Sequence, residues 1–251
     1  MNKLNLIKQN FYENGYVQIK KLFHYKDIRS IFSQIKDIKK KSIKVKNPNM
    51  HFTRDRKLNT IHDMNTYIKR GSIIQISKNK KLLTIVEKIL GEKASVRNIE
   101  FFLKPKKTGM RSPYHQDNFY WNIENKKALN VWIACSPANI KNGGMCYYKS
   151  SHKNGLIQHI LSSEPGSSQK IPEEKLKEIK KRKVYPDLKS GDCIIHHCEV
   201  VHGSKKNTSN LDRIGLVISY KGKSAKINKK KIQRYRNLVK KNNKSLKKNK
   251  N

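Results

Sequence analysis

Residues Tyr114–Trp121 read YHQDNFYW, which places a histidine and an aspartate two positions apart inside an aromatic segment. On a β-strand alternate side chains share a face, so His115 and Asp117 would project together while Gln116 points the other way. An imidazole and a carboxylate on one face are two members of the 2-His-1-carboxylate set that binds non-haem iron(II). The pair alone is weak evidence, because the rest of the chain has to provide a second imidazole.

The second imidazole is available in GDCIIHHCEVVHGS, residues 191–204, where His202 stands near the end. A rival pair, His197 and Glu199, has only His202 beyond it, three residues after Glu199. All three donors of that rival site would have to come from one strand end. We therefore predict that His115, Asp117 and His202 form the metal site.

Arg213 follows His202 by eleven residues, in HGSKKNTSNLDRIGLVISY. 2-Oxoglutarate chelates iron through its 2-oxo acid end, and its distal carboxylate needs a cation, ideally the planar fork of an arginine. A turn in KKNTSNLD would fold the next strand back beside the strand of His202 and bring Arg213 to the iron pocket. Ser204 shares a face with His202 and can donate its hydroxyl to the same carboxylate.

The cysteines show no metal-binding or disulfide pattern. No two of the four are spaced as C-x-x-C, and the chain starts without the apolar region of a secretory signal, so we expect reduced thiols in a cytoplasmic protein. On a strand, Cys193 and His197 face away from His196 and Cys198, so these four residues cannot surround one zinc ion. We expect them to pack in the interior.

The net charge of +39 invites a nucleic-acid interpretation. Lysine, however, supplies 47 of the 57 basic residues, and arginine, the usual base-recognising residue, supplies only 10. Lys, Asn and Ile are abundant in every segment, which is typical of an A/T-biased genome, so the charge is weak evidence about partners. No run approaches the ~20 apolar residues that a membrane span needs.

The chain divides into a helical first region and a β-rich second region. Apolar periodicity predicts helices at Leu4–Glu13, Tyr25–Lys41 and from an N-cap at Ser77 to a stop at Gly91. Residues 41–60 are polar and predict a loop. From Ala94 onward, short β-like runs predict a sandwich or barrel, namely ASVRNIEFFLK, ALNVWIACSPA, GGMCYYK, KVYPDL, GDCIIHHCEVVHG and RIGLVISYKG. Residues 162–183 interrupt them as a polar insertion, with a helix predicted at Glu173–Lys181.

In chain order these motifs resemble the phytanoyl-CoA dioxygenase-like family of Fe(II)/2-oxoglutarate oxygenases. The matching segments lie between residues 6 and 221: FYENGYVQIKKLF, KILG, YHQDNFYW, LNVWIACSP, NGGMCYYKSSHKNG and GDCIIHHCEVVHGSKKNTSNLDRIGLVISY. The resemblance implies a mainly β fold with flanking helices, a double-stranded β-helix (a cupin-like jelly roll). It implies one oxygenase domain at residues 1–221, in which a helical N-terminal region (residues 1–93) precedes a jelly-roll core (residues 94–221). A basic helix or tail would follow at residues 222–251.

The resemblance also implies the roles of the site residues. His115, Asp117 and His202 would be the iron ligands and catalytic centre, Arg213 and Ser204 would bind 2-oxoglutarate, and Trp132 would line the co-substrate pocket. Halogenating relatives replace the carboxylate with a small residue, so Asp117 indicates a hydroxylase. The implied reaction uses Fe(II), 2-oxoglutarate and O2, and releases succinate and CO2.

The sequence leaves the substrate open. The aromatic residues Tyr114, Phe119 and Trp121 are candidates for the substrate mouth, and sheet packing is an equal alternative. The basic run Lys104–Arg111 is a candidate for attracting an anionic small molecule. We expect specificity to reside in the loops 51–67 and 162–183. The alternative function is a basic nucleic-acid or anionic-surface binding protein on an inactive jelly-roll scaffold, which leaves His202 and Arg213 without a role.

Overall fold

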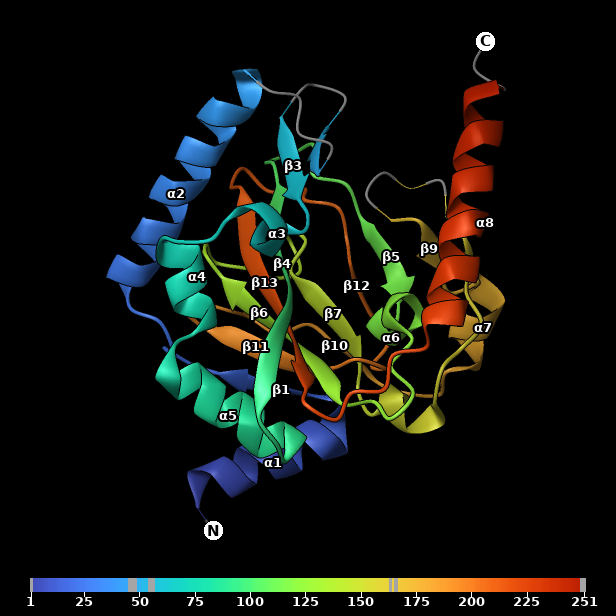
Figure 1. Cartoon of the computed structure of the whole chain (residues 1–251), viewed down its shortest axis with the longest axis horizontal. Coiled ribbons are helices and arrows are strands. Elements are labelled where there is room, and N and C mark those ends of the chain that lie inside the picture. Colours follow the sequence, from blue (N-terminus) through green and yellow to red (C-terminus); the bar gives the residue numbers. More distant parts are fainter. Residues whose placement is uncertain (1, 45–48, 54–56, 163, 165–166, 249–251) are drawn as a thin grey trace.

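Two antiparallel sheets form the centre of the molecule (Figure 1). The structure is a computed structural model that describes residues 2–44, 49–53, 57–162, 164 and 167–248. The major sheet has the order β1 (Tyr16–Ile19), β11 (Cys193–His197), β6 (Ala128–Ala134), β13 (Arg213–Gly222), β4 (Ala94–Lys104), β3 (Leu58–Ile61) and β2 (Met50–Phe52). The minor sheet has the order β10 (Lys183–Val184), β7 (Met145–Tyr148), β12 (His202–Ser204) and β5 (Ser112–His115). β8 (Ile160–Leu161) and β9 (Gln169–Lys170) pair separately.

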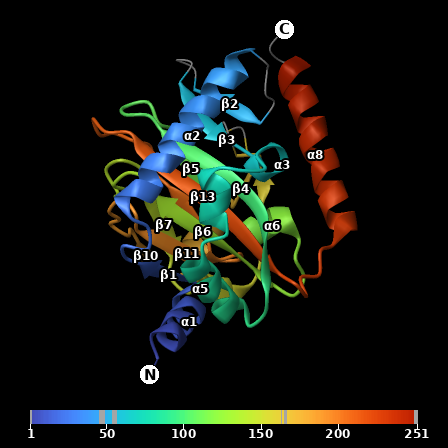
Figure 2. The same cartoon turned by 60° about the vertical axis from the view of Figure 1, so that its left-hand side comes forward.

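Helices lie around this β core. They are α1 (Lys3–Asn14), α2 (Tyr25–Lys44), α3 (Met64–Tyr67), α4 (Ser72–Ser77), α5 (Lys80–Leu90), α6 (Asp117–Trp121), the 3-10 turn η1 (Ser151–Asn154), α7 (Glu173–Glu178) and α8 (Lys229–Lys248). Figures 1 and 2 show α1, α2, α4 and α5 on one side of the molecule and α8 on the other. Helices α1 to α5 precede Ala94 and most strands follow it, but β1, β2 and β3 lie in the first region, so the division at residue 94 stays a prediction.

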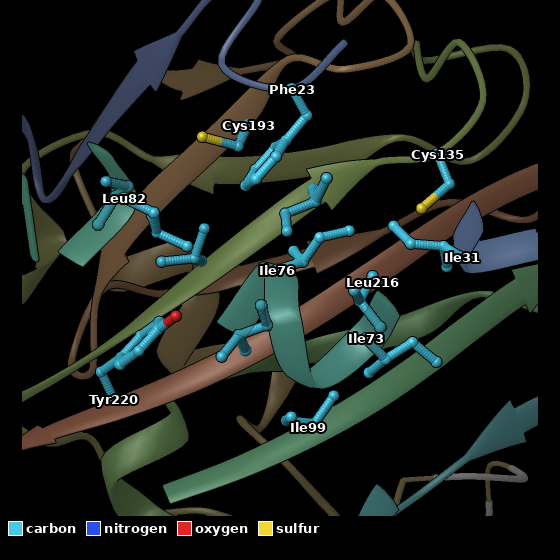
Figure 3. Close-up of a cluster of buried hydrophobic side chains, with 14 of the residues drawn as sticks. Phe23, Ile31, Ile73, Ile76, Leu82, Ile99, Cys135, Cys193, Leu216 and Tyr220 are labelled. Atoms are coloured by element: carbon cyan, nitrogen blue, oxygen red, sulfur yellow. The ribbon is translucent and has the colours of Figure 1, made fainter. Parts of the chain in front are cut away.

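The main apolar core fills the space between the N-terminal helices and the outer face of the major sheet. Helix residues such as Ile31, Ile73 and Leu82 meet sheet residues such as Leu216, and all four are fully buried (Figure 3). Each such side chain contributes roughly 1.5–3 kcal/mol by leaving water. Tyr220 adds a hydrogen bond from its hydroxyl to Ser77 O at 2.7 Å, which ties β13 to α4.

Capping residues explain where the first helices begin and end. The Asn2 side chain accepts a hydrogen bond from Leu4 N at the start of α1, and Gly15 ends the helix with a φ of 81°, a conformation that glycine adopts without strain. The predicted N-cap at Ser77 is wrong, because Ser77 is the last residue of α4. Asn79 caps α5 instead by accepting from Leu82 N, and Gly91 stops that helix as predicted.

Two other secondary-structure predictions need correction. The polar stretch 41–60 contains the end of α2 and strands β2 and β3, although residues 45–48 and 54–56 lie outside the described residues. Polarity was a poor guide there, because the two strands bury only a few apolar residues, Met50, Leu58 and Ile61, in the main core. The run GDCIIHHCEVVHG is two strands, β11 and β12, which belong to different sheets.

The C-terminal segment forms α8 through Lys248. Its Tyr235 ring lies 5.7 Å from Tyr120 of α6, and its hydroxyl is 2.5 Å from Ser168 Oγ, so the helix packs on the molecule. No helix within the described ranges has the length and apolar character that crossing a membrane requires. The boundary at residue 221 stays a prediction.

Candidate metal centre

The three predicted ligands come together where the minor sheet meets α6. β5 ends at His115, β12 begins at His202, and these two residues are direct cross-strand partners. The expectation that His115 and Asp117 share one strand is wrong, because the strand stops at His115 and Asp117 is the first residue of α6. The extended Gln116 between them still turns the carboxylate toward the imidazoles.

The donor atoms converge closely. Asp117 Oδ1 lies 3.7 Å from His115 Nε2 and 3.8 Å from His202 Nε2. One ligand atom from each residue lies within 4.8 Å of the other two, and no second such group occurs among the residues that the structure describes. Transition-metal bonds of about 2.1 Å place neighbouring donors about 3–4 Å apart, so one ion fits between these atoms.

Backbone carbonyls fix the tautomers of both histidines. His115 Nδ1 lies 2.8 Å from Pro113 O, and His202 Nδ1 lies 3.0 Å from Val200 O. A carbonyl oxygen only accepts, so each Nδ1 carries the hydrogen and each Nε2 presents a lone pair. Two lone pairs and a carboxylate oxygen therefore face one another without a proton between them. Such a donor set fits a divalent cation and is unfavourable without one.

The protonation equilibria favour the same state. Burial lowers the pKa of His115 to about 4, helped by the nearby His202, and burial lowers the pKa of His202 to about 4 as well. Burial opposes ionisation of Asp117, but the neighbouring His202, His196 and His115 hold its pKa below the usual value. The ligands are thus two neutral imidazoles and one carboxylate at neutral pH, the forms that bind metal.

A second polar site lies beside the metal centre. Arg213 and Lys104 are cross-strand partners on β13 and β4, and each is less than 5% exposed. Lys104 Nζ donates to Ser204 Oγ at 2.7 Å and to Lys205 O at 2.6 Å. Neither cation has an acidic partner among the residues described, and Arg213 Nε has no hydrogen-bond partner there. Two buried positive charges without an anion form a site for a carboxylate.

Strand connectivity at this second site differs from expectation. β13 does not lie beside β12: it belongs to the major sheet, between β6 and β4, so the chain crosses between sheets after Ser204. Lys104 nevertheless links Arg213 to Ser204, because it is the cross-strand partner of Arg213 and donates to Ser204 Oγ. Trp132 on β6 lies under the Arg213 guanidinium, 5.5 Å from ring centroid to Cζ, and a side chain on Gly215 would collide with its ring. The pocket and the sheet core therefore both use Trp132.

Burial lowers the pKa of Arg213 to about 9. Burial, together with the charge of Arg213, also lowers the pKa of Lys104 well below its ordinary value. An anion between the two side chains would raise both pKa values again, because its negative charge would compensate for the hydration that burial removes.

The predicted substrate aromatics occupy three different environments. Phe119 stacks on His159 with centroids 4.0 Å apart, close to the ligand histidines. Trp121 is buried in a small cluster with Ile123. Tyr114 packs edge-on against Tyr148 at 5.1 Å in another apolar cluster, and its hydroxyl bonds Cys146 Sγ. These aromatics are therefore not brought together at the metal centre.

The basic run Lys104–Arg111 is not one surface. Lys104 is buried in the second polar site, while Arg111 is ion-paired with Glu164 at 2.6 Å. A basic residue that was not predicted is Arg97, whose Cζ lies 4.7 Å from the Trp121 ring. Only the strand order places Lys104 beside Arg213, because its sequence neighbours resemble the rest of this lysine-rich chain.

Glu199 of the rival pair has a structural role. Its Oε1 accepts from Asn118 Nδ2 at 2.9 Å, and its Oε2 pairs with Lys126 Nζ at 2.9 Å. His197 packs against Phe11 on the other face of β11. All four cysteines are free and buried.

Comparison with known proteins agrees with this geometry. The family model described as phytanoyl-CoA dioxygenase (PhyH) matches residues 11–215. The chain is 23% identical over 223 residues to a probable alpha-ketoglutarate-dependent hypophosphite dioxygenase of Stutzerimonas stutzeri, covering 85% of this chain and 77% of that protein. It is 30% identical over 125 residues to phytanoyl-CoA dioxygenase 1 of Oryza sativa subsp. japonica, covering 49% of this chain and 43% of that protein.

Among solved structures, EctD from S. alaskensis with 2-oxoglutarate and 5-hydroxyectoine superimposes with a TM-score of 0.73 at 17% identity, covering 91% of this chain and 78% of that one. The predicted double-stranded β-helix with flanking helices is thereby confirmed.

Proposed function

The chain belongs to the phytanoyl-CoA dioxygenase family of iron- and 2-oxoglutarate-dependent oxygenases, and we propose that it hydroxylates a C–H bond of a small molecule with His115, Asp117 and His202 as iron ligands. One observation carries this assignment of ligands. Two imidazole lone pairs and a carboxylate oxygen converge within metal-binding distance, with both histidine tautomers fixed by backbone carbonyls.

Iron(II) held by these three residues would supply the oxidising chemistry of hydroxylation together with 2-oxoglutarate and O2, and succinate and CO2 would be the products of 2-oxoglutarate. His115, Asp117 and His202 would hold the ion with only three donors, a set that would leave room for the co-substrate, oxygen and the approach of substrate. Retention of Asp117 supports hydroxylation over halogenation, because the carboxylate fills the position that a halide would take. The comparisons give no support to the nucleic-acid alternative.

We assign the distal carboxylate of 2-oxoglutarate to Arg213, Ser204 and Lys104. Arg213 offers a bidentate guanidinium that lacks an acid among the described residues. The Ser204 oxygen already accepts from Lys104, so its own hydrogen is free to be donated to the carboxylate. Trp132 lies beneath the guanidinium, with its ring centroid 5.5 Å from Arg213 Cζ.

The substrate is proposed to be an anionic small molecule. Arg97 supports this, because its half-buried guanidinium stacks on Trp121 and makes no hydrogen bond within the described chain. Glu100, Asp117 and Asp63 lie within its electrostatic reach. Arg236 of α8 adds positive charge in the same region. The hypophosphite dioxygenase with which the chain shares 23% identity is named for an anionic substrate. Turnover of anionic compounds, and its loss in Arg97→Met, would be measured by succinate release.

A cytoplasmic location is also proposed. Its support is the set of four free, buried cysteines, which is typical of reducing compartments.

The decisive experiment is anaerobic addition of 2-oxoglutarate to the Fe(II)-loaded protein while recording the metal-to-ligand charge-transfer absorbance. We expect a band in the wild type, no band in Asp117→Ala, and at least a 30-fold weaker 2-oxoglutarate affinity in Arg213→Ala, from a lost buried charge pair worth about 2–5 kcal/mol. A folded wild-type protein that retains no iron and shows no band would overturn the proposal.

A further inference from the structure

The two oxygens of Asp117 have different surroundings. His196 Nε2 lies 3.1 Å from Asp117 Oδ2, and Asn130 Nδ2 donates to the same atom at 2.7 Å. The other oxygen, Oδ1, faces the two ligand histidines and accepts no hydrogen bond from a residue in the described ranges. One oxygen is thus held by the protein and the other is left for the metal.

The donors to Oδ2 form a row across the major sheet. His196 on β11 is the cross-strand partner of Asn130 on β6, which is in turn the partner of Ser219 on β13. Ser219 Oγ donates to Asn130 Oδ1 at 2.5 Å, so the amide hydrogens of Asn130 point toward Asp117. Residues on one face of three adjacent strands therefore aim two N–H groups at a single carboxylate oxygen.

Tyr147 fixes the orientation of His196 from the opposite sheet. Its hydroxyl lies 3.1 Å from His196 Nδ1, and its ring stacks on His202 with centroids 5.9 Å apart. A neutral imidazole has one donor and one acceptor nitrogen. Because the Asp117 carboxylate only accepts, His196 Nε2 donates to it and Nδ1 accepts from Tyr147. These groups therefore form a hydrogen-bond chain in which the Tyr147 hydroxyl donates to His196 and His196 donates to Asp117.

We propose that His196 is a positioning residue that turns the Asp117 carboxylate so that only Oδ1 reaches the iron. The inference rests on the proposed function, since it concerns the same centre. With two donors on Oδ2 the carboxylate binds through one oxygen, and the open positions stay open. Without His196, Oδ2 keeps one donor, and the carboxylate is free to rotate and bind through both oxygens.

The neighbouring His197 provides a matched control. It lies on the same strand and is also buried, but its ring faces the helices, 5.7 Å from Phe11 and 4.8 Å from His152. A histidine needed only for packing would affect stability in the same way at either position. A positioning residue would affect the metal at position 196 alone.

The experiment is anaerobic titration of the metal-free full chain with Fe(II) and with Co(II), whose d–d spectrum reports coordination number. The variants are His196→Leu, His196→Gln, Tyr147→Phe and the control His197→Leu, each first checked for folding by circular dichroism. We expect His196→Leu to bind metal 10- to 100-fold more weakly, the usual range for a residue that orients a ligand. We expect a changed Co(II) spectrum in the same variant.

His196→Gln keeps an N–H donor and should recover most of the affinity and the wild-type spectrum. Tyr147→Phe removes only the hydroxyl, so it should weaken binding less, and it tests the proposal even if His196→Leu does not fold. His197→Leu should match the wild type in both readouts. Wild-type affinity and spectrum in folded His196→Leu or, should that variant not fold, in Tyr147→Phe would overturn the inference. A wild type that binds no metal would instead overturn the proposed function.

Discussion

On the outer face of the major sheet, strands β4, β6, β11 and β13 present fully buried apolar side chains to the helices, while on the inner face the same strands present ions and hydrogen-bonding groups. The outer set includes Ile99, Val131, Ile195 and Ile218, and the inner set includes Lys104, Asn130, His196, Arg213 and Ser219. The side-chain period of two makes this possible, since neighbours in sequence belong to different environments. The outer face is complete in itself. The inner face carries the buried charges of Lys104 and Arg213, which lack an acidic partner among the described residues, and it lies against the His202 ring, 4.6 Å from that of His196.

The strongest test of this contrast is removal of a proposed metal ligand next to the inner face. We expect His202→Ala to weaken Fe(II) binding by more than about 100-fold, beyond the range for residues that only orient a ligand. The melting temperature of the metal-free protein should fall only by what the His202 Nδ1 hydrogen bond to Val200 O and the packing of one ring contribute, because Nε2 has no protein donor to lose. Isothermal titration and thermal denaturation measure the two quantities. A large loss of stability with metal binding intact would contradict the division.

The converse test is a cavity on the outer face. Ile218 is fully buried among the helices, so Ile218→Ala should lower the free energy of unfolding by about 2–5 kcal/mol. Ile218 points away from the metal centre, since its neighbours Val217 and Ser219 are the residues that face inward. The folded fraction should therefore bind Fe(II) with unchanged affinity. Urea denaturation followed by metal titration of the folded protein separates the effects. A weakened affinity would mean that the two faces are mechanically coupled.

A smaller effect is expected at Lys104, whose buried charge should favour 2-oxoglutarate binding and lower the stability of the folded protein. Lys104→Met removes a charge-assisted hydrogen bond, worth about 1.5 kcal/mol at the low end, and should weaken 2-oxoglutarate binding roughly 10-fold. The same change should leave the protein as stable or more stable, because a buried ammonium without an acid is unfavourable. Isothermal titration calorimetry measures the expected loss of 2-oxoglutarate affinity, and thermal denaturation measures the expected equal or higher stability. Lower stability with unchanged binding would assign Lys104 to the structure alone.

The sequence singles out the three residues that converge at the candidate metal centre, but not the residues that support them. His115, Asp117 and His202 stand out because short motifs place them, and β4 was predicted with its observed bounds because turns flank an unbroken apolar-rich run. Lys104 is one lysine among 47, and its role appears only when β4 pairs with β13. His196 was interpreted as packing, because its partner Asn130 lies on a strand that is distant in sequence. Which strands pair is determined by the whole core, and local sequence does not encode it.

The remaining prediction concerns the pH dependence of stability at His197, the outward neighbour of His196. Burial, together with the charges of His152, Lys126 and His196, lowers the pKa of His197 to about 3, whereas an exposed histidine in the unfolded chain titrates near 6.5. Between these values the unfolded state binds the extra proton, so stability is lost as the pH falls below about 6.5 and the loss continues toward pH 3. One histidine contributes about 1.4 kcal/mol per pH unit at most.

His197→Gln keeps a hydrogen-bond acceptor for Glu199 N. It should make the dependence of the unfolding free energy on pH shallower by up to about 1.4 kcal/mol per pH unit between pH 6 and pH 4. Urea denaturation of both proteins across that range gives the difference, in which the other histidines cancel. Parallel curves would mean that His197 is protonated in the folded state, and the outer face of β11 would then tolerate a charge that its apolar neighbours make unfavourable.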